Sequence, residues 1–305
     1  DQWGAFAGGG MHLTSGSVDV GQWQHVAVIF EPGVGTKLFK NGVLVESWTD
    51  IRHNAQNGTV TVGATPGGGA FFDGRIDDVR VFDHAIRDDD VQLIYEAAPI
   101  LQLHLDEPAG ATEFQDSSGN GNGGDCIGTS CPNAGLKGRV GLAPGFDGLD
   151  DGIQVSDDWL LDLNSFTVGA WVMPGEILSV QQNLIDKSQN YGIALAASGL
   201  TPTLETGNQT VQSDVELSLD TWSHVMGTYD DETKELEIYV NGYLQGSKRL
   251  AGSFTPPNNS AALRLGGVEG RFAGQLDEVT LYSRALSPFE VRDIFLYQGK
   301  WVEDR

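Results

Sequence analysis

The chain repeats a set of motifs at an interval of about 200 residues, as the numbering of the paired motifs shows. In chain order the pairs are Trp23-Gln-His25 with Trp222-Ser-His224, Asn41-Gly42 with Asn241-Gly242, and Gly74-Arg-Ile-Asp77 with Gly274-Gln-Leu-Asp277. Repetition at a fixed period indicates copies of one structural unit in series. We therefore expect residues 99–305 to form a complete module. We expect residues 1–98 to form the C-terminal half of another, with its N-terminal half missing.

Apolar and polar residues alternate along most of the chain, which is typical of β-strands with one buried face. Leu236, Ile238 and Val240 share one face of such a segment, and Asn241-Gly242 follows as a hairpin turn. The 41 glycines and 11 prolines favour many turns between short strands. Helical signals are confined to short stretches such as the one at Ser287-Pro288. The pattern predicts an all-β fold of antiparallel two-sheet sandwiches, with a short helical turn at the end of each module.

Composition restricts the environment and the partners of the chain. A net charge of −24 repels nucleic acids and anionic membrane surfaces, so we expect neither as a partner. No stretch of about 18 apolar residues is present, so we expect no membrane span in this sequence. Cys126 and Cys131 lie in one loop without a neighbouring histidine, which favours a local disulfide over a zinc site or two thiols. A disulfide implies a secreted or cell-surface location.

Several motifs in a fixed order give the chain a family likeness. They are Phe114-Gln-Asp116-Ser-Ser-Gly-Asn120-Gly-Asn122, Phe146-Asp-Gly-Leu-Asp-Asp151, Trp222-Ser-His224-Val, the hairpin at Asn241-Gly242, and Gly274-Gln-Leu-Asp277-Glu-Val. Together they resemble the laminin-G-like jelly rolls of the concanavalin A-like lectin/glucanase superfamily. The resemblance covers residues 99–305 and the repeated part of residues 1–98, and it implies a jelly-roll sandwich. That superfamily includes lectins, carbohydrate-binding modules, adhesion domains and glycanases, so function must be argued from the site.

Calcium is the cofactor that this resemblance implies. The loop from Asp116 to Asn122 offers one carboxylate and the side-chain amides of Asn120 and Asn122, and hard cations prefer such oxygen ligands. The resemblance further implies a carboxylate from Asp277 and a backbone carbonyl near Gly274 on the other side of the site. The alternative is an ordinary Asx-rich turn, with Asp277 bound to a backbone amide.

Catalysis is not expected from the acidic residues of this chain. Glycanases of this fold carry two or three carboxylates on one strand, where they act as acid and nucleophile. Glu235 and Glu237 share a face, but the third acid is missing because the strand continues with Ile238, Tyr239 and Val240.

Sugar binding needs aromatic rings and planar polar groups on an exposed surface. Tyr191, Tyr239 and Tyr243 are the candidate ligand-binding residues, together with Trp48 and Trp159. Core packing is the alternative for each of them, because the sequence does not fix which rings face solvent.

The sequence hypothesis is a non-catalytic, calcium-stabilised binding or adhesion module of a large secreted or cell-surface protein, with a glycan or a protein as ligand. Two alternatives stay open: a structural repeat of an extracellular filament, stalk or sheath, and an accessory carbohydrate-binding module of a glycanase. Half a module would expose sheet edges and core faces. We therefore expect the strands that complete residues 1–98 to come from a separate chain, either a cleaved N-terminal piece or a neighbouring subunit that donates strands. The alternative is that residues upstream of Asp1 supply them.

Overall fold

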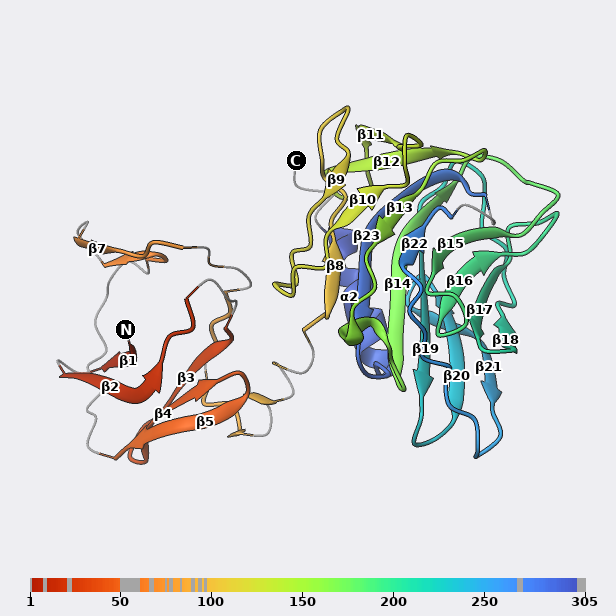
Figure 1. Ribbon diagram of the computed structural model, residues 1–305. Coiled ribbons are helices and arrows are strands. Elements are labelled where there is room, and N and C mark those ends of the chain that lie inside the picture. The colour runs from red at the N-terminus through yellow and green to blue at the C-terminus, as the bar shows by residue number, and fades with distance from the viewer. Residues whose placement is uncertain are drawn as a thin grey trace. The chain divides into compact units, whose positions relative to one another are not determined.

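The computed structural model describes residues 2–7, 10–20, 24–49, 61–65, 69–74, 76, 79–82, 84–88, 91, 92, 95, 98–267 and 271–300. The chain divides into two compact units. Unit 1 comprises Asp1–Ala97 and unit 2 comprises Ala98–Arg305. Both consist mainly of antiparallel strands (Figure 1).

Unit 2 contains two eight-stranded antiparallel sheets. In spatial order the first sheet consists of β18 (Gln209–Gln212), β17 (Pro202–Thr206), β16 (Gly192–Leu195), β15 (Gln182–Asp186), β22 (Leu263–Leu265), β13 (Ile153–Val155), β10 (Gly124–Cys126) and β9 (Glu113–Phe114). The second consists of β11 (Asn133–Lys137), β12 (Leu142–Asp147), β23 (Ala273–Tyr282), β14 (Phe166–Pro174), β19 (Ser223–Asp230), β20 (Glu235–Val240) and β21 (Tyr243–Arg249), with β8 (Leu101–Leu103) paired to β23. The predicted all-β, antiparallel two-sheet fold is confirmed.

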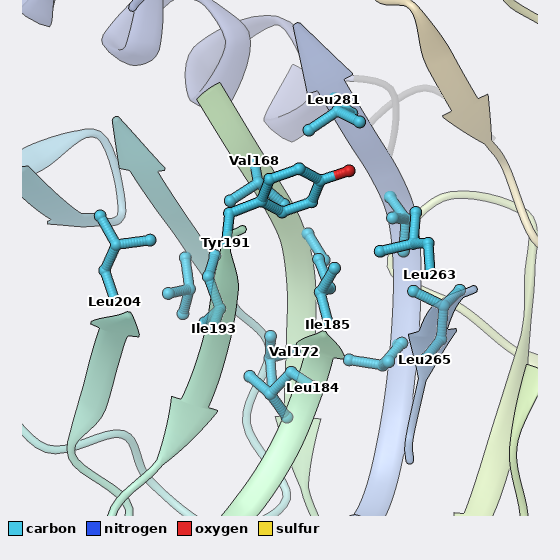
Figure 2. Close-up of a cluster of buried hydrophobic side chains, with 14 of the residues drawn as sticks. Val168, Val172, Leu184, Ile185, Tyr191, Ile193, Leu204, Leu263, Leu265 and Leu281 are labelled. Carbon is cyan, nitrogen blue, oxygen red and sulfur yellow. The ribbon is translucent and has the colours of Figure 1, made fainter. Parts of the chain in front are cut away.

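One hydrophobic core lies between these sheets (Figure 2). Leu263 and Leu265 of β22 are buried in it, whereas Arg264 between them is only half-buried. Successive side chains of a strand point to opposite faces, so this alternation turns one face of the sheet inward and the other outward. Burying one leucine or isoleucine side chain contributes about 1.5–3 kcal/mol. Because most strands of both sheets supply apolar side chains to it, the core holds the two sheets together.

A smaller apolar cluster packs the end of the chain onto the outer side of the second sheet. Its members are Met226, Tyr239, Tyr282, Leu286 and Val291. Val291 belongs to α2 (Pro288–Lys300). Ser287 caps this helix, because the Glu290 carboxylate accepts hydrogen bonds from the Ser287 backbone N–H and hydroxyl, each at 2.8 Å.

His224 belongs to the framework beneath α2. Its ring centroid lies 5.3 Å from that of Trp171 and 6.1 Å from that of Phe295. Burial lowers the pKa of His224 from 6.5 to about 4, so the ring is neutral at physiological pH. The His224 backbone N–H donates to Asn241 Oδ1 at 2.9 Å, which fixes the start of β19 to the hairpin turn.

Unit 1 contains three small sheets. They are the pair β1 (Gln2–Ala7) and β2 (Gly10–Ser17), the three-stranded sheet of β3 (Val26–Glu31), β4 (Gly35–Lys40) and β5 (Val43–Trp48), and the pair β6 (Ala64–Thr65) and β7 (Gly69–Phe71). The three-stranded sheet repeats the geometry of β19, β20 and β21. Asn41 and Gly42 have φ of 50° and 76°, and Asn241 and Gly242 have 50° and 77°. Positive φ at both positions is what a two-residue hairpin turn requires.

Unit 1 exposes apolar side chains whose counterparts in unit 2 are buried. Val79 is 58% exposed and Val81 is 84% exposed, whereas Val279 and Leu281 lie in the core of unit 2. The latter two belong to β23, which pairs with both β14 and β8. The described residues between Val79 and Phe82 form no strand, and Trp23 and Asp77 lie outside the described residues.

A fully buried lysine joins several loops of unit 2. The Lys187 Nζ atom lies 2.6 Å from Asp157 Oδ1 and 3.5 Å from Asp162 Oδ1. It also donates to the backbone carbonyl oxygens of Asn259 and Ala261. An ammonium group has three protons, so all of them find acceptors inside the protein.

The predicted disulfide between Cys126 and Cys131 is confirmed. It closes a short loop at the end of β10, and Cys126 packs against the main core. Among the helices that the structure describes, none has the length and apolar character needed to cross a membrane.

Candidate functional site

A row of polar side chains crosses the outer face of the first sheet of unit 2, and we call it the polar row. Strand register places its members side by side in the order Thr210, Glu205, Gly192, Asp186, Arg264, Gln154, Asp125 and Glu113. The row takes one residue from each of the eight strands. Its members alternate with residues of the main core, so their side chains leave the sheet on the side away from the core.

Arg264 is the cation at the centre of the polar row. It lies directly between Asp186 and Gln154 of the neighbouring strands. Its Nε atom is buried and has no hydrogen-bond partner within the described part of the chain. A buried donor without an acceptor costs free energy, so a ligand oxygen bound there would be stabilising. Gly192, the next member beyond Asp186, is buried and adds no side chain to the row.

The chemistry of the polar row suits a ligand rich in hydroxyl groups. Arg264 offers only donors, Asp186 and Glu205 offer acceptors, and Gln154 offers both. Neighbouring strands lie about 4.8 Å apart, so successive groups of the row present themselves at regular intervals. The arrangement can therefore bind an extended ligand that runs across the strands.

Sequence reasoning missed the polar row, although part of its signal is visible. Arg264 and Gln154 are each the middle residue of an apolar–polar–apolar triplet, in Leu263-Arg264-Leu265 and Ile153-Gln154-Val155. Such triplets predict an outward side chain. They do not tell which strands become neighbours, and that information comes only from the sheet order.

The Asp116 loop is closed by its own hydrogen bonds. Asp116 Oδ1 accepts from the backbone N–H groups of Gln102 at 3.1 Å and Ser118 at 2.9 Å. Asp116 Oδ2 accepts from the Ser118 hydroxyl at 2.9 Å and the Asn122 N–H at 2.8 Å. Asn120 uses its side-chain nitrogen as a donor to a backbone carbonyl at 2.9 Å. This geometry is that of an Asx-rich turn, in which the acceptor positions of the carboxylate are occupied.

Asp277 lies in a different environment, against the turn from Gly138 to Gly141. Its Oδ2 atom accepts from the Val140 N–H at 2.9 Å, and its Oδ1 atom is buried with no partner among the described residues. A Cβ at Gly138 would lie 2.7 Å from Asp277 Oδ2, and one at Gly141 would lie 2.2 Å from Asp106 Oδ1. The absence of a side chain at Gly138 and Gly141 thus leaves a cradle next to the two carboxylates. A Cβ at either glycine would fill it.

The Asp277 carboxylate is strongly perturbed. Its pKa is raised from 3.8 to about 8, mainly because the carboxyl group is buried. Backbone hydrogen bonds from Val140 and Arg139 oppose this rise, and the negative charges of Glu278 and Asp106 add to it. A buried carboxylate with an unpaired oxygen, beside a second carboxylate, is a donor set that a hard cation prefers.

The expected calcium ligands make separate sets of contacts. Asp116 and the two asparagines of its loop contact that loop and the segment around β8. Gly274 is paired within the second sheet. Asp277 contacts the turn from Gly138 to Gly141. In the part of the chain that the structure describes, no hydrogen bond joins the Asp116 loop to Gly274 or Asp277.

A second acidic group lies in the turn after β12. Carboxylate oxygens of Asp147, Asp150 and Asp151 all lie within 4.8 Å of one another. Asp151 accepts from the Asp147 N–H at 2.9 Å, and Asp150 accepts from the Ser130 hydroxyl at 2.8 Å. Burial raises the pKa of Asp151. Two of the three side chains are exposed, so we regard the group as a solvated turn.

Two of the three candidate tyrosines are not on the surface. Tyr191 is fully buried and donates to a backbone carbonyl at 3.1 Å. Tyr239 is also buried and donates to Glu237 Oε2 at 2.5 Å. The prediction that these two bind ligand is wrong, because each ring fills an apolar cluster and its hydroxyl is satisfied internally. Tyr243 is 53% exposed, with the Arg292 guanidinium 5.0 Å from its ring centroid.

Comparison with known proteins identifies the family. The family model described as the concanavalin A-like lectin/glucanases superfamily matches residues 2–92 and 146–292. A comparison with curated proteins found no match.

Three solved structures illustrate the fold. The chain is similar to the binding domain of Paraclostridial Mosquitocidal Protein 1 at 18% identity and a TM-score of 0.51, covering 66% of this chain and 52% of that one. It is similar to Domain 4 of AbnA, a GH43 extracellular arabinanase from Geobacillus stearothermophilus, in complex with arabinotriose. The identity is 22% and the TM-score 0.50, covering 64% of this chain and 97% of that one. It is also similar to the binding domain of Botulinum Neurotoxin DC in complex with SialylT, at 14% identity and a TM-score of 0.51, covering 67% of this chain and 52% of that one.

These identities show the fold alone, and the chain spans about half the length of the two binding domains. The family match rests on most of the sequence, in both units. The chain belongs to the concanavalin A-like lectin/glucanases superfamily.

Proposed function

We propose that this protein is a non-catalytic binding module whose ligand is a glycan, bound along the polar row of unit 2. The observation that carries the proposal is the buried Nε of Arg264, which has no acceptor within the described residues and lies at the centre of the row. Sugar hydroxyls are donors and acceptors at once, so they match a row that offers both kinds of group.

The named relatives support this ligand class. The arabinanase domain was solved in complex with arabinotriose, which is a sugar, and that domain is covered over 97% of its length. The structures of Paraclostridial Mosquitocidal Protein 1 and of Botulinum Neurotoxin DC are both named as binding domains. A binding role without catalysis fits these names.

The acidic residues of unit 2 support the absence of catalysis. Glu235 and Glu237 lie on the outer side of β20, where Glu237 Oε2 accepts the hydrogen bond of the Tyr239 hydroxyl. A glycosidase needs one carboxylic acid and one carboxylate on either side of the scissile bond. One oxygen of Glu237 is engaged by the buried Tyr239, and β20 carries no third acid beside this pair.

Replacing Arg264 with alanine is expected to weaken glycan binding about ten- to a hundredfold, because a hydrogen bond to a charged group contributes about 1.5–3 kcal/mol. Isothermal titration calorimetry with arabino-oligosaccharides and sialylated lactose, in the presence of calcium, would measure the affinity. Arg249→Ala is the matched control, since Arg249 lies at the edge of the other sheet with its side chain 73% exposed. Unchanged affinity in Arg264→Ala, or an equal loss in Arg249→Ala, would argue against the polar row.

Calcium is proposed as a structural cofactor of unit 2, held by the Asp277 and Asp106 carboxylates and by backbone oxygens of the turn from Gly138 to Gly141. The unpaired Oδ1 of Asp277 and the glycine cradle support this assignment. A bound calcium ion would supply the positive charge that the two carboxylates lack. Asp106 and Asp277 would then hold the turn against β23.

A secreted or cell-surface location is proposed from the disulfide and from one similar structure. A disulfide persists in oxidising compartments, and Cys126 and Cys131 form one. One relative is described as extracellular.

A protein partner is proposed for unit 1. Within the described residues β3 pairs only with β4, whereas the equivalent β19 pairs with β20 on one side and β14 on the other. Val28 of β3 is 53% exposed. An open strand edge with apolar side chains binds an added strand. A neighbouring chain would supply a strand with the alternation of β14, whose residues Phe166–Pro174 are almost all buried.

A synthetic peptide with the sequence of Phe166–Pro174 is therefore expected to protect the backbone amides of Val26–Glu31 from hydrogen exchange. Mass spectrometry of the full chain with and without the peptide would measure this protection. A peptide carrying Ala170→Pro is the control, because proline removes one donor and disrupts the added strand. If neither peptide changes exchange in β3, or both change it equally, strand addition at this edge is excluded.

A further inference from the structure

A groove of about 490 Å³ opens on the outer side of the second sheet of unit 2. It lies between the β19–β20 hairpin and the start of α2. One wall carries carboxylates and the other carries apolar groups. The carboxylates of the first wall are Asp230, Glu235 and Glu237. The second wall holds Ala285, Leu286 and Pro288 together with the Arg284–Glu290 ion pair.

The groove carries uncompensated negative charge. Arg284 is the one cation in its lining, and Glu290 holds it through hydrogen bonds of 2.6 and 3.1 Å. Glu237 has no ion-pair partner among the described side chains, and its Oε2 atom accepts the hydrogen bond of the Tyr239 hydroxyl. A cationic group entering the groove would therefore meet Glu237 as an unneutralised anion.

Unit 1 fills the equivalent place with a lysine of its own. The repeat aligns Lys37 of β4 with Glu237 of β20, and Asp88 with Pro288. The Lys37 Nζ atom lies 2.6 Å from Asp88 Oδ1 and 2.8 Å from Asp88 Oδ2. The ammonium group of Lys37 thus links β4 to the segment at Asp88. In unit 2 the lysine is replaced by an acid and the aspartate by proline, so this place lacks its cation.

The shape of the acidic wall favours an extended ligand over a metal ion. A calcium or magnesium ion needs oxygens that converge on one point. Among the described residues, the only three acids whose carboxylate oxygens all lie within 4.8 Å of one another are Asp147, Asp150 and Asp151. Asp230, Glu235 and Glu237 therefore do not converge on one point. A lysine side chain combines an apolar stem with a terminal ammonium, which matches one apolar wall and one acidic wall. No aromatic ring lines the groove for a sugar to stack on.

We propose that this groove receives a lysine side chain of a partner polypeptide, with the ammonium bound to Glu237 and the stem packed against Leu286 and Pro288. The groove lies on the sheet opposite to the polar row. The inference is therefore independent of glycan binding, and either can fail alone.

Fluorescence anisotropy with a labelled Gly-Ser-Gly-Lys-Gly-Ser-Gly peptide at low salt would test the proposal. The wild-type chain is expected to bind this peptide more tightly than the same peptide with norleucine in place of lysine. Glu237→Gln is expected to weaken binding about tenfold, the effect of losing one charged contact of about 1.4 kcal/mol. Glu232→Gln removes the same charge from the same hairpin outside the groove and is expected to change affinity less than about twofold.

A second variant separates binding from folding. Glu237→Lys combined with Pro288→Asp recreates the Lys37–Asp88 pair of unit 1 inside unit 2, so it is expected to fold and to lose lysine binding. Thermal melting by circular dichroism would confirm folding. Equal binding of the lysine and norleucine peptides would overturn the proposal. So would full affinity in Glu237→Gln, or binding of glucosamine oligomers but of no lysine peptide.

Discussion

Replacing Lys187 with methionine is expected to lower the free energy of unfolding by about 3–5 kcal/mol. The ammonium of Lys187 is fully buried and satisfies Asp157, Asp162 and two backbone carbonyls. Methionine fills a similar volume but offers no donor. The two carboxylates and the two carbonyls would then lose the ammonium that they share, in a place that is partly shielded from water. Removing one partner of a buried ion pair is strongly destabilising because it leaves the other charge uncompensated.

Urea unfolding followed by tryptophan fluorescence would measure the effect as a lower midpoint with an unchanged slope. Lys248→Met is the matched control, because Lys248 is exposed and makes one contact of 3.4 Å, to a backbone carbonyl. Its expected change is below about 0.5 kcal/mol. A loss of less than about 1 kcal/mol in Lys187→Met would mean that water replaces the ammonium, and the loops at Asp157 and Asn259 would then not depend on it.

Calcium is expected to stabilise unit 2 through Asp277, and more strongly at pH 8 than at pH 6. The pKa of Asp277 is raised from 3.8 to about 8, so between these values the metal-free folded protein holds a proton that the unfolded chain releases. Stability from this group is therefore fully present below about pH 4 and is lost as the pH rises through about 8, with a slope of up to about 1.4 kcal/mol per pH unit. Calcium competes with that proton, so its stabilising effect grows with pH.

Thermal melting with calcium or with a chelator, at pH 6 and pH 8, would measure this linkage. At a calcium concentration about 100 times Kd the expected stabilisation is about 2.7 kcal/mol. Asp277→Asn is expected to abolish the calcium response and to remove the pH-dependent loss in the metal-free protein. Asp116→Asn should keep the response, because Asp116 is occupied by four donors of its own chain. If Asp116→Asn abolished the calcium response and Asp277→Asn kept it, calcium would bind at the Asp116 loop and not at Asp277.

The strand framework was predictable because its signals are local. The hairpin of β20 and β21 needs only alternating residues on both sides of Asn241-Gly242, and the same signal recurs at Asn41-Gly42. Both hairpins form with the expected turn geometry. The disulfide of Cys126 was equally local, since its partner lies five residues away.

The candidate sites were only partly predictable because they depend on strands that are distant in sequence. The motif around Asp277 was identified, but its neighbour Asp106 was not. Asp106 follows β8, and only the pairing of β8 with β23 brings it to this place. Tyr191 was misplaced for a different reason. A tyrosine ring suits either face of a strand, and one internal hydrogen bond is enough to make burial of its hydroxyl tolerable.

The alternation of buried and outward residues in β22 has an evolutionary consequence. Leu263 and Leu265 pack in the core, while Arg264 between them points to the outer face of the sheet. Mutation at the outward position can alter what the surface recognises and leave the scaffold intact, because substitutions away from the core usually change stability by less than about 0.5 kcal/mol. A module of this kind can therefore change what it recognises while its scaffold stays the same.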